Sequence, residues 1–264
     1  MIKFFRHIRK RLIDDPPEHN GSVRAGNRFS KYLLYAIGEI ILVVIGILIA
    51  LQINNWNEDR KNKTTEGNYY CRLLEDFELD KQNIKRLSEE SDYKIKKSKA
   101  LLLELPKKQK SKEYLIDNYI QGLRTNAFTP SKVTILDITS SGKLNLINND
   151  SLKKTLIRYY AELDNLIYQL DLNRNHSIER AFAYEDDNQV GFQYADYAKA
   201  SLGDEIMATL PIDNWHLDES STVYKQFQND LVFFVLMSNR EKQHFKKILD
   251  QMQPVYNQLK KLCH

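Results

Sequence analysis

The chain has 264 residues, with 39 Lys or Arg against 35 Asp or Glu, and therefore a formal net charge of +4. Basic residues gather near the N-terminus, but no aromatic or glycine-rich pattern accompanies them, which argues against a nucleic-acid-binding protein. One long apolar segment lies in the first quarter of the chain and predicts a membrane protein.

The first 15 residues, MIKFFRHIRKRLIDD, predict a helix with one apolar face and one basic face. Such a helix can lie on an anionic lipid leaflet; a solvated basic tail is the alternative. Two prolines and two glycines between residues 14 and 27 then form a hinge. We assign residues 1–30 to a cytoplasmic tail with this hinge, and we expect its membrane contacts to include Phe4, Phe5, Arg6, Arg9, Lys10 and Arg11.

The next segment, YLLYAIGEIILVVIGILIALQINNW, predicts a transmembrane helix over residues 31–56. As an α-helix, residues 32–53 would cover roughly 33 Å, and the hydrocarbon core of a bilayer is about 30 Å thick. Tyr32 and Trp56 would lie in the two headgroup zones. A buried core helix is disfavoured because residues 40–51 are apolar on every side. A cleavable signal peptide is disfavoured because Leu48-Ile49-Ala50 matches the cleavage pattern poorly.

Glu39 is the one acidic residue inside the apolar segment. An ionised carboxyl near the bilayer centre costs on the order of 3 kcal/mol, less near an edge, and usually faces a partner or water. Gly46 lies seven residues further on, and Gly46 and Ala50 form a pair of small residues of the kind that lets membrane helices approach closely. We therefore predict a helix-contact face at Glu39, Gly46 and Ala50. A neutral or snorkelling carboxyl is the alternative.

The charges beside the span favour a cytoplasmic N-terminus. The 31-residue leading tail holds eight Lys or Arg, of which three lie within about 20 residues of the span, whereas residues 57–76 hold four. Short tails count toward the positive-inside bias, but long domains cross the membrane largely regardless of charge. We expect the tail in the cytoplasm, the span in the inner (cytoplasmic) membrane and residues 57–264 in the periplasm.

Residues beyond the span follow a helical period and show no convincing alternation of apolar and polar residues. One helix should rise from the span until Pro106. A second should lie within 111–128, and a third should stop at Gly142, which can adopt a left-handed cap. Asn149 or Asp150 should cap a fourth helix that reaches about residue 184, and 223–259 should form the last. We predict an all-α protein whose span continues as a stalk into an antiparallel bundle.

The two cysteines are Cys71, which lies 15 residues past Trp56, and Cys263, at the end of the last predicted helix. If that helix runs antiparallel to the stalk, Cys263 returns toward Cys71. The periplasm permits disulfides, and this one would stabilise the domain by roughly 4 kcal/mol in the chain-entropy model. The geometric requirement is strict, so two unpaired cysteines are the interpretation that we favour.

A search for catalytic or metal-binding patterns returns little. Ser140-Ser141-Gly142-Lys143 lacks the earlier glycine of a phosphate loop, and the six histidines share no metal-ligand spacing. The acidic residues at 185–187 lack the alternating ligands of a calcium loop. We therefore expect no metal, no cofactor and no enzymatic activity.

Three stretches resemble a family of Gram-negative bacterial single-pass membrane proteins of uncharacterised function. They are MIKFFR at the start, KYLLYAIGEIILVVIGILIALQINNWNE around the span and SSGKLNLINNDSLKKTLIRYY in the bundle. The resemblance implies an N-terminal anchor with a GEIILVVIGILIALQINNWN-type span and a helical domain outside the cytoplasm. It implies no ligand and no catalytic residue. The hinge at residues 14–27 is longer than is usual in that family, which puts contacts between tail and span in doubt.

Two functions fit these features. The first is a membrane-anchored scaffolding or interaction protein of the cell envelope, with the lipid bilayer and a second copy or another membrane protein as partners of the span. The second is an extracytoplasmic ligand sensor that signals through a separate partner, because the tail is too short to hold an output domain. We favour the first because it needs nothing that the sequence lacks. An exposed apolar patch on the bundle would support it, whereas an apolar pocket with convergent polar groups would support sensing.

Overall fold

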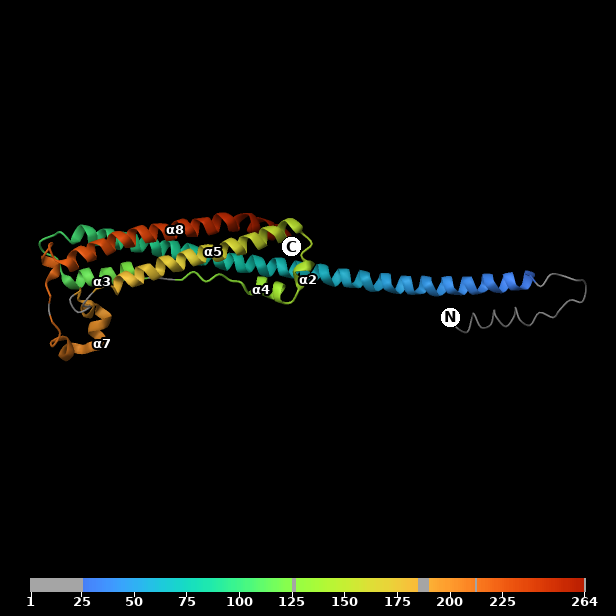
Figure 1. Cartoon of the computed structure of the whole chain (residues 1–264), viewed down its shortest axis with the longest axis horizontal. Helices are drawn as coiled ribbons and strands as arrows, with labels where there is room; N and C mark the ends of the chain where they lie inside the picture. Colours follow the sequence, from blue (N-terminus) through green and yellow to red (C-terminus); the bar gives the residue numbers. More distant parts are fainter. Residues whose placement is uncertain (1–25, 125–126, 185–189, 212, 264) are drawn as a thin grey trace, which may run out of the picture. The chain divides into compact units, whose positions relative to one another are not determined.

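The computed structural model describes residues 26–124, 127–184, 190–211 and 213–263. These residues form six α-helices and three 3-10 helices and contain no strand, so the predicted all-α fold is confirmed. The chain divides into two compact units, Met1–Arg60 and Lys61–His264. The second unit is the helical bundle in Figure 1.

Helix α2, Gly26–Glu104, contains both the apolar segment and the first helix of the bundle. Its 79 residues include no proline, and the helix ends two residues before Pro106, as predicted. The secondary structure therefore continues without a break from the apolar segment into the bundle.

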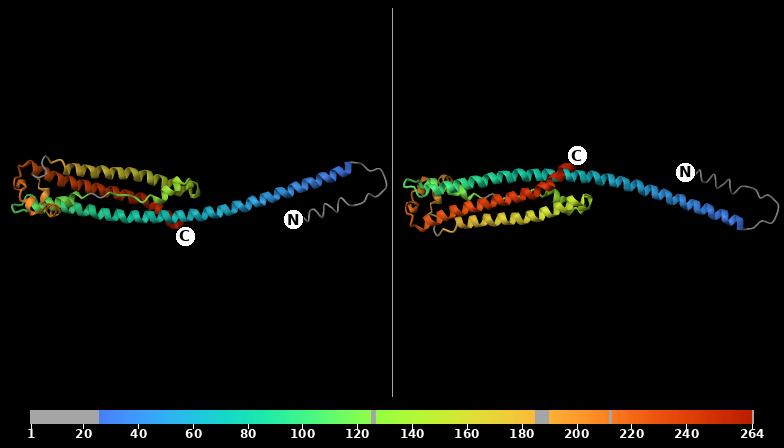
Figure 2. Two further views of the ribbon diagram at one scale, coloured as in Figure 1. Left: turned by 90° about the horizontal axis from the view of Figure 1, so that it is seen from below. Right: turned by 90° about the horizontal axis from the view of Figure 1, so that it is seen from above.

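Helices α5, Asp150–Ala181, and α8, Thr222–Leu262, lie beside α2 in the bundle (Figures 1 and 2). Helix α8 is antiparallel to α2, because Tyr256 donates a hydrogen bond to Glu78 at 3.1 Å while Lys242 pairs with Asp92 at 2.5 Å. Helix α5 is antiparallel to α8, because Gln251 donates a hydrogen bond to Glu162 while Arg240 donates one to Gln169. The antiparallel bundle is thus as predicted.

Local signals end the shorter helices where the sequence indicates. Helix α3, Lys112–Leu123, begins after Ser111, whose side chain accepts a hydrogen bond from the Tyr114 amide. Helix α4, Val133–Ser140, is followed by Gly142 at φ 69°, the left-handed conformation expected there. Asn149 caps α5 by accepting a hydrogen bond from the Leu152 amide at 2.9 Å.

Helix α7, Asp196–Met207, was not predicted. It has no buried residue and contains a kink at Gly203, where φ is 77°. A helix without a buried stripe leaves no apolar period in the sequence, which explains why it was missed. The 3-10 helices Phe192–Tyr194 and Trp215–Leu217 flank it in sequence.

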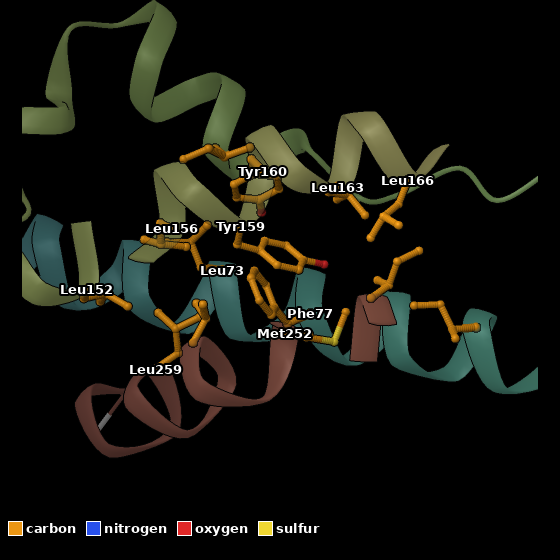
Figure 3. Close-up of a cluster of buried hydrophobic side chains, with 14 of the residues drawn as sticks. Leu73, Phe77, Leu152, Leu156, Tyr159, Tyr160, Leu163, Leu166, Met252 and Leu259 are labelled. Atoms are coloured by element: carbon orange, nitrogen blue, oxygen red, sulfur yellow. The ribbon is translucent and has the colours of Figure 1, made fainter. Parts of the chain in front are cut away.

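The buried apolar side chains of the described residues form two separate clusters. The Phe77 cluster contains residues of α2, α5 and α8, which point toward one another in Figure 3. It includes Leu73, Phe77, Leu156, Tyr159, Leu163, Phe245, Ile248, Met252 and Leu259. The Tyr119 cluster occupies the other end of the bundle and includes Leu101, Leu105, Leu115, Tyr119, Trp215, Phe227, Leu231 and Phe234. Both clusters bury large side chains almost completely.

Candidate functional site

The aliphatic side chains of the apolar segment of α2 are exposed. From Leu33 to Ile53, the Leu, Ile and Val side chains have exposed fractions of 45% to 67%. Among the described residues, α2 is the one helix that is long and apolar enough to cross a membrane. Removing such a surface from water is favourable by roughly 25 cal/mol per Å², so this segment is a candidate membrane span.

Glu39, Gly46 and Ala50 are all exposed on this segment. A Cβ atom added to Gly46 would meet no other atom within 4 Å. No described part of the chain therefore covers the predicted contact face. The predicted membrane-surface residues Phe4, Phe5, Arg6, Arg9, Lys10 and Arg11 lie outside the described residues.

Cys71 and Cys263 form a disulfide, with their Cα atoms 4.8 Å apart. Our expectation of two unpaired cysteines is wrong, and the alternative holds. The physical reason is that α8 returns antiparallel to α2 and its last turns are anchored by Val255 and Leu259, both fully buried. The bond thus ties the end of α8 to α2 and closes a loop with a sequence separation of 192 residues.

Asp76 and Asp80 hold the start of α4 against α2. Asp76 accepts hydrogen bonds from the Ser131 hydroxyl at 2.6 Å and the Thr134 amide at 3.1 Å. Asp80 accepts one from the Ser131 amide at 2.7 Å. Burial and the neighbouring carboxylate of Asp76 raise the pKa of Asp80 to about 6, although the Ser131 amide opposes this shift.

A buried polar section separates the two apolar clusters. Its residues occupy the core side of three helices: Ser91, Lys94 and Ser98 of α2, Asn173 and Ser177 of α5, and Ser238, Glu241 and His244 of α8. Lys94 Nζ donates a hydrogen bond to Glu241 Oε2 at 2.6 Å, and Ser91 Oγ lies 3.1 Å from the same oxygen.

Several polar atoms of this section have no hydrogen-bond partner among the residues that the structure describes. They are Ser98 Oγ, Asn173 Nδ2 and both ring nitrogens of His244. Burial lowers the pKa of His244, and the neighbouring Arg240 and Lys247 lower it further. Each buried, unpaired polar group typically costs about 1–3 kcal/mol, so the polar section stabilises the bundle less than the apolar clusters do.

A second buried network surrounds Asp230 of α8, which is 1% exposed. Its Oδ2 atom accepts hydrogen bonds from the hydroxyls of Tyr119 at 3.0 Å and Tyr184 at 2.8 Å, and Arg180 lies 3.3 Å from Oδ1. Burial raises the pKa of Asp230, while the three donors oppose that shift. The Arg180 guanidinium also lies 4.3 Å from the ring centroid of Phe233.

Two hollows open on the surface of the bundle. One, of about 430 Å³, is lined by Thr65, Asn68, Tyr69, Cys71 and Arg72. The other, of about 270 Å³, is lined by Arg180, Asn229, Val232, Phe233 and Leu236. Within the described parts of the chain, no three His, Cys, Asp or Glu side chains gather as metal ligands.

The second hollow is lined in part by two exposed apolar side chains of α8. Val232 and Leu236, one turn apart, have exposed fractions of 45% and 57%. Exposed apolar side chains beside an arginine held by stacking and an ion pair are typical of protein-interaction surfaces.

The polar section could have been found in the sequence from polar residues that occupy core positions of the helical period, which a search for apolar residues alone does not detect. On α8 the core positions 231, 234, 238, 241, 245 and 248 keep three- and four-residue spacing, and Ser238 and Glu241 occupy two of them. Polar residues in register with apolar ones therefore mark the buried section. The Asp230 network has no comparable signal, because its partners come from distant segments.

Comparison with known proteins gives one match. The model of a family described as one of unknown function (DUF6090) matches residues 39–182, which covers more than half of the chain. No curated protein and no solved structure matches the chain. The matched region runs from Glu39 to the end of α5 and includes most of the apolar segment.

Proposed function

The chain belongs to this family of unknown function, and we propose that it is a membrane-anchored scaffolding or interaction protein of the cell envelope. One observation carries the proposal: the apolar side chains from Leu33 to Ile53 are uncovered in a chain whose next 200 residues form a packed bundle. A bilayer would cover this surface, and the span would then hold the bundle at the membrane.

The proposed topology places the tail in the cytoplasm, the span in the inner (cytoplasmic) membrane and the bundle in the periplasm. The basic N-terminal tail supports this orientation. The disulfide between Cys71 and Cys263 supports it independently, because disulfides persist in oxidising compartments such as the periplasm and are rare in the cytosol.

The proposed partners are the lipid bilayer and either a second copy or another membrane protein, which would contact Glu39, Gly46 and Ala50. The exposed Val232 and Leu236 support a further protein contact on the bundle. We assign no catalytic activity. Ligand sensing remains the alternative function. It is the weaker proposal because both hollows are open to solvent, whereas a small-molecule site encloses most of its ligand.

Reporter fusions at residue 264 test the topology. Activity of a fused reporter that works only in the periplasm supports the proposal. Activity of a reporter that works only in the cytoplasm contradicts it.

Crosslinking in intact cells, followed by identification of the crosslinked proteins, tests the scaffolding role. We expect one or a few envelope proteins to be captured by the parent and lost when Val232 and Leu236 are both changed to Ser. A parent that crosslinks to no protein, or a variant that captures the same proteins, would contradict the role.

A further inference from the structure

We propose that the bundle opens in two steps, because the polar section divides it into two halves that unfold separately. The Phe77 half contains the Phe77 cluster and the disulfide. The Tyr119 half contains the Tyr119 cluster and α3. The Tyr119 half opens first, while the Phe77 half stays folded. This inference concerns the bundle alone and goes beyond the proposed function.

Apolar packing is interrupted at the same level on three helices. On α2, the buried positions between Leu87 and Leu101 are Ser91, Lys94 and Ser98. On α8, those between Phe234 and Phe245 are Ser238, Glu241 and His244. Helix α5 continues from Leu170 with Asn173 and Ser177. Among the described residues, no buried apolar side chain of these helices lies within the section, so dispersion contacts between the two clusters are few.

Polar contacts replace the missing packing only in part. Lys94 and Glu241 form a buried ion pair between α2 and α8 here, with side chains only 10% and 12% exposed. The second ion pair at this level, Lys242 with Asp92, lies on the surface and contributes little. A buried ion pair is weak evidence for stability, since its desolvation opposes its attraction. Ser98, Asn173 and His244 keep unpaired polar atoms at the same level. The coupling between the halves is therefore weak compared with the packing inside each half.

The two halves also differ in how they are closed. The disulfide joins α2 to the end of α8 in the Phe77 half and restricts separation of these helices even when local contacts break. The Tyr119 half has no disulfide, because the chain has two cysteines and both lie in the Phe77 half. Opening of the Tyr119 half would expose Tyr119, Trp215 and Phe227, whose rings are in contact: Phe227 stacks on Tyr119 and packs at a tilt against Trp215. A protein partner could bind these aromatic side chains once they are exposed.

Hydrogen exchange of the full chain in detergent micelles, read by mass spectrometry at increasing denaturant, tests this division. We expect the amides of α3 and of residues 222–234 to share one opening equilibrium constant. The amides of residues 152–170 and 245–259 should share another that is at least tenfold smaller. A single constant for all four segments would overturn the proposal, as would earlier opening of the Phe77 half.

Replacing the ion pair by an apolar pair tests the role of the polar section. In the double variant Lys94→Met with Glu241→Leu, the ratio of the opening constants of the two halves should fall at least threefold, because apolar side chains would then join the two clusters. The matched control is Lys246→Met with Asp250→Leu, which removes an exposed ion pair of α8 and should leave the ratio of the constants unchanged. An unchanged ratio in the Lys94→Met, Glu241→Leu variant would overturn the assigned boundary.

Ser98→Ala tests the same boundary if the double variant does not fold. It removes an unpaired hydroxyl and should also lower the ratio of the two opening constants. An unchanged ratio in Ser98→Ala would likewise overturn the boundary.

Discussion

Helix α2 contains two segments with the same backbone geometry and different surroundings. From Leu33 to Ile53, apolar side chains point in every direction and all the Leu, Ile and Val side chains are exposed. From residue 70 to 105, buried residues recur at three- and four-residue steps, as in Tyr70, Leu73 and Phe77, and polar residues occupy the buried positions between Leu87 and Leu101. The side facing away from the bundle core is mostly polar there, and Leu79, Tyr93 and Leu103 are its exposed exceptions. The distribution of apolar residues around the helix, rather than their number, decides what can cover it.

The two segments of α2 therefore need different surroundings. Helices α5 and α8 cover the one-sided apolar stripe by packing on it in the bundle. An apolar surface on all sides needs a medium that surrounds the helix, which a bilayer provides. Changes confined to one segment should therefore affect bundle stability or membrane insertion, but not both.

The largest expected effect is on the bundle alone. Removing the disulfide with Cys71→Ser and Cys263→Ser should lower the free energy of unfolding by about 4 kcal/mol, because the unfolded chain regains the freedom lost in a long closed loop. Denaturant unfolding of the full chain in detergent micelles measures this change. The reduced parent should unfold with the variant, whereas insertion into membranes should be unaffected. An oxidised parent that unfolds at the same denaturant concentration as the variant would contradict the stabilising role of the bond.

A charge placed in the apolar segment should have the second-largest effect. Leu42→Arg puts a cation near the centre of the proposed span and should oppose insertion by about 3 kcal/mol. Leu79→Arg is a matched control on the same helix, because the exposed fractions of Leu42 and Leu79 are 56% and 58%. The control should insert like the parent. Resistance to alkaline extraction from membranes measures the difference, and equal resistance of both variants would argue against a span.

The sequence predicted those parts of the fold that depend on local chemistry. The end of α2 before Pro106, the left-handed Gly142 and the cap at Asn149 each require one or a few neighbouring residues. The antiparallel bundle was predicted from the helical apolar period of the segments beyond the span. The predicted contact face, Glu39 with Gly46 and Ala50, remains a prediction, since no described residue contacts it.

Features that depend on distant segments were not predictable. Asp230 meets Tyr119 of α3 and Tyr184, which follows α5, only because three segments converge in space. The disulfide was weighed but not favoured, because its geometry depends on the register of α8 against α2 over many turns. The polar section was missed for a different reason: an apolar period was sought, and Ser91, Lys94 and Ser98 continue that period with polar side chains.

The predicted contact face at Glu39, Gly46 and Ala50 can be tested by a change confined to the proposed span. Gly46→Ile should weaken association of the span by about 1.4 kcal/mol, or tenfold in the association constant, because the larger side chain prevents close approach. Glu39→Gln should have a smaller effect, since an amide keeps hydrogen-bonding capacity. A membrane two-hybrid assay measures both, with Val43→Ile as the control for added bulk elsewhere. Association of both variants at the level of the parent would exclude self-contact through this face.

The smallest expected effect tests the charges inside the bundle. The pKa of Asp80 is raised from 3.8 to about 6 in the folded chain. A raised folded-state pKa gives a stabilising contribution that is fully present below about pH 3.8 and is lost as pH rises through about 6. Asp80→Asn keeps an oxygen that can accept the Ser131 amide hydrogen bond but removes the charge that lies beside Asp76.

The Asp80→Asn variant should therefore be more stable than the parent by about 1 kcal/mol at pH 7.5, with the difference shrinking toward zero at pH 4. Denaturant unfolding of the full chain at both pH values measures it. The control is Asp92→Asn, which changes an exposed aspartate of the same helix paired with Lys242; an exposed ion pair contributes little, so we expect a shift below about 0.5 kcal/mol at pH 7.5. A variant less stable than the parent at pH 7.5 would mean that the ionised Asp80 is stabilised by its contact with the start of α4 more than it is penalised by burial.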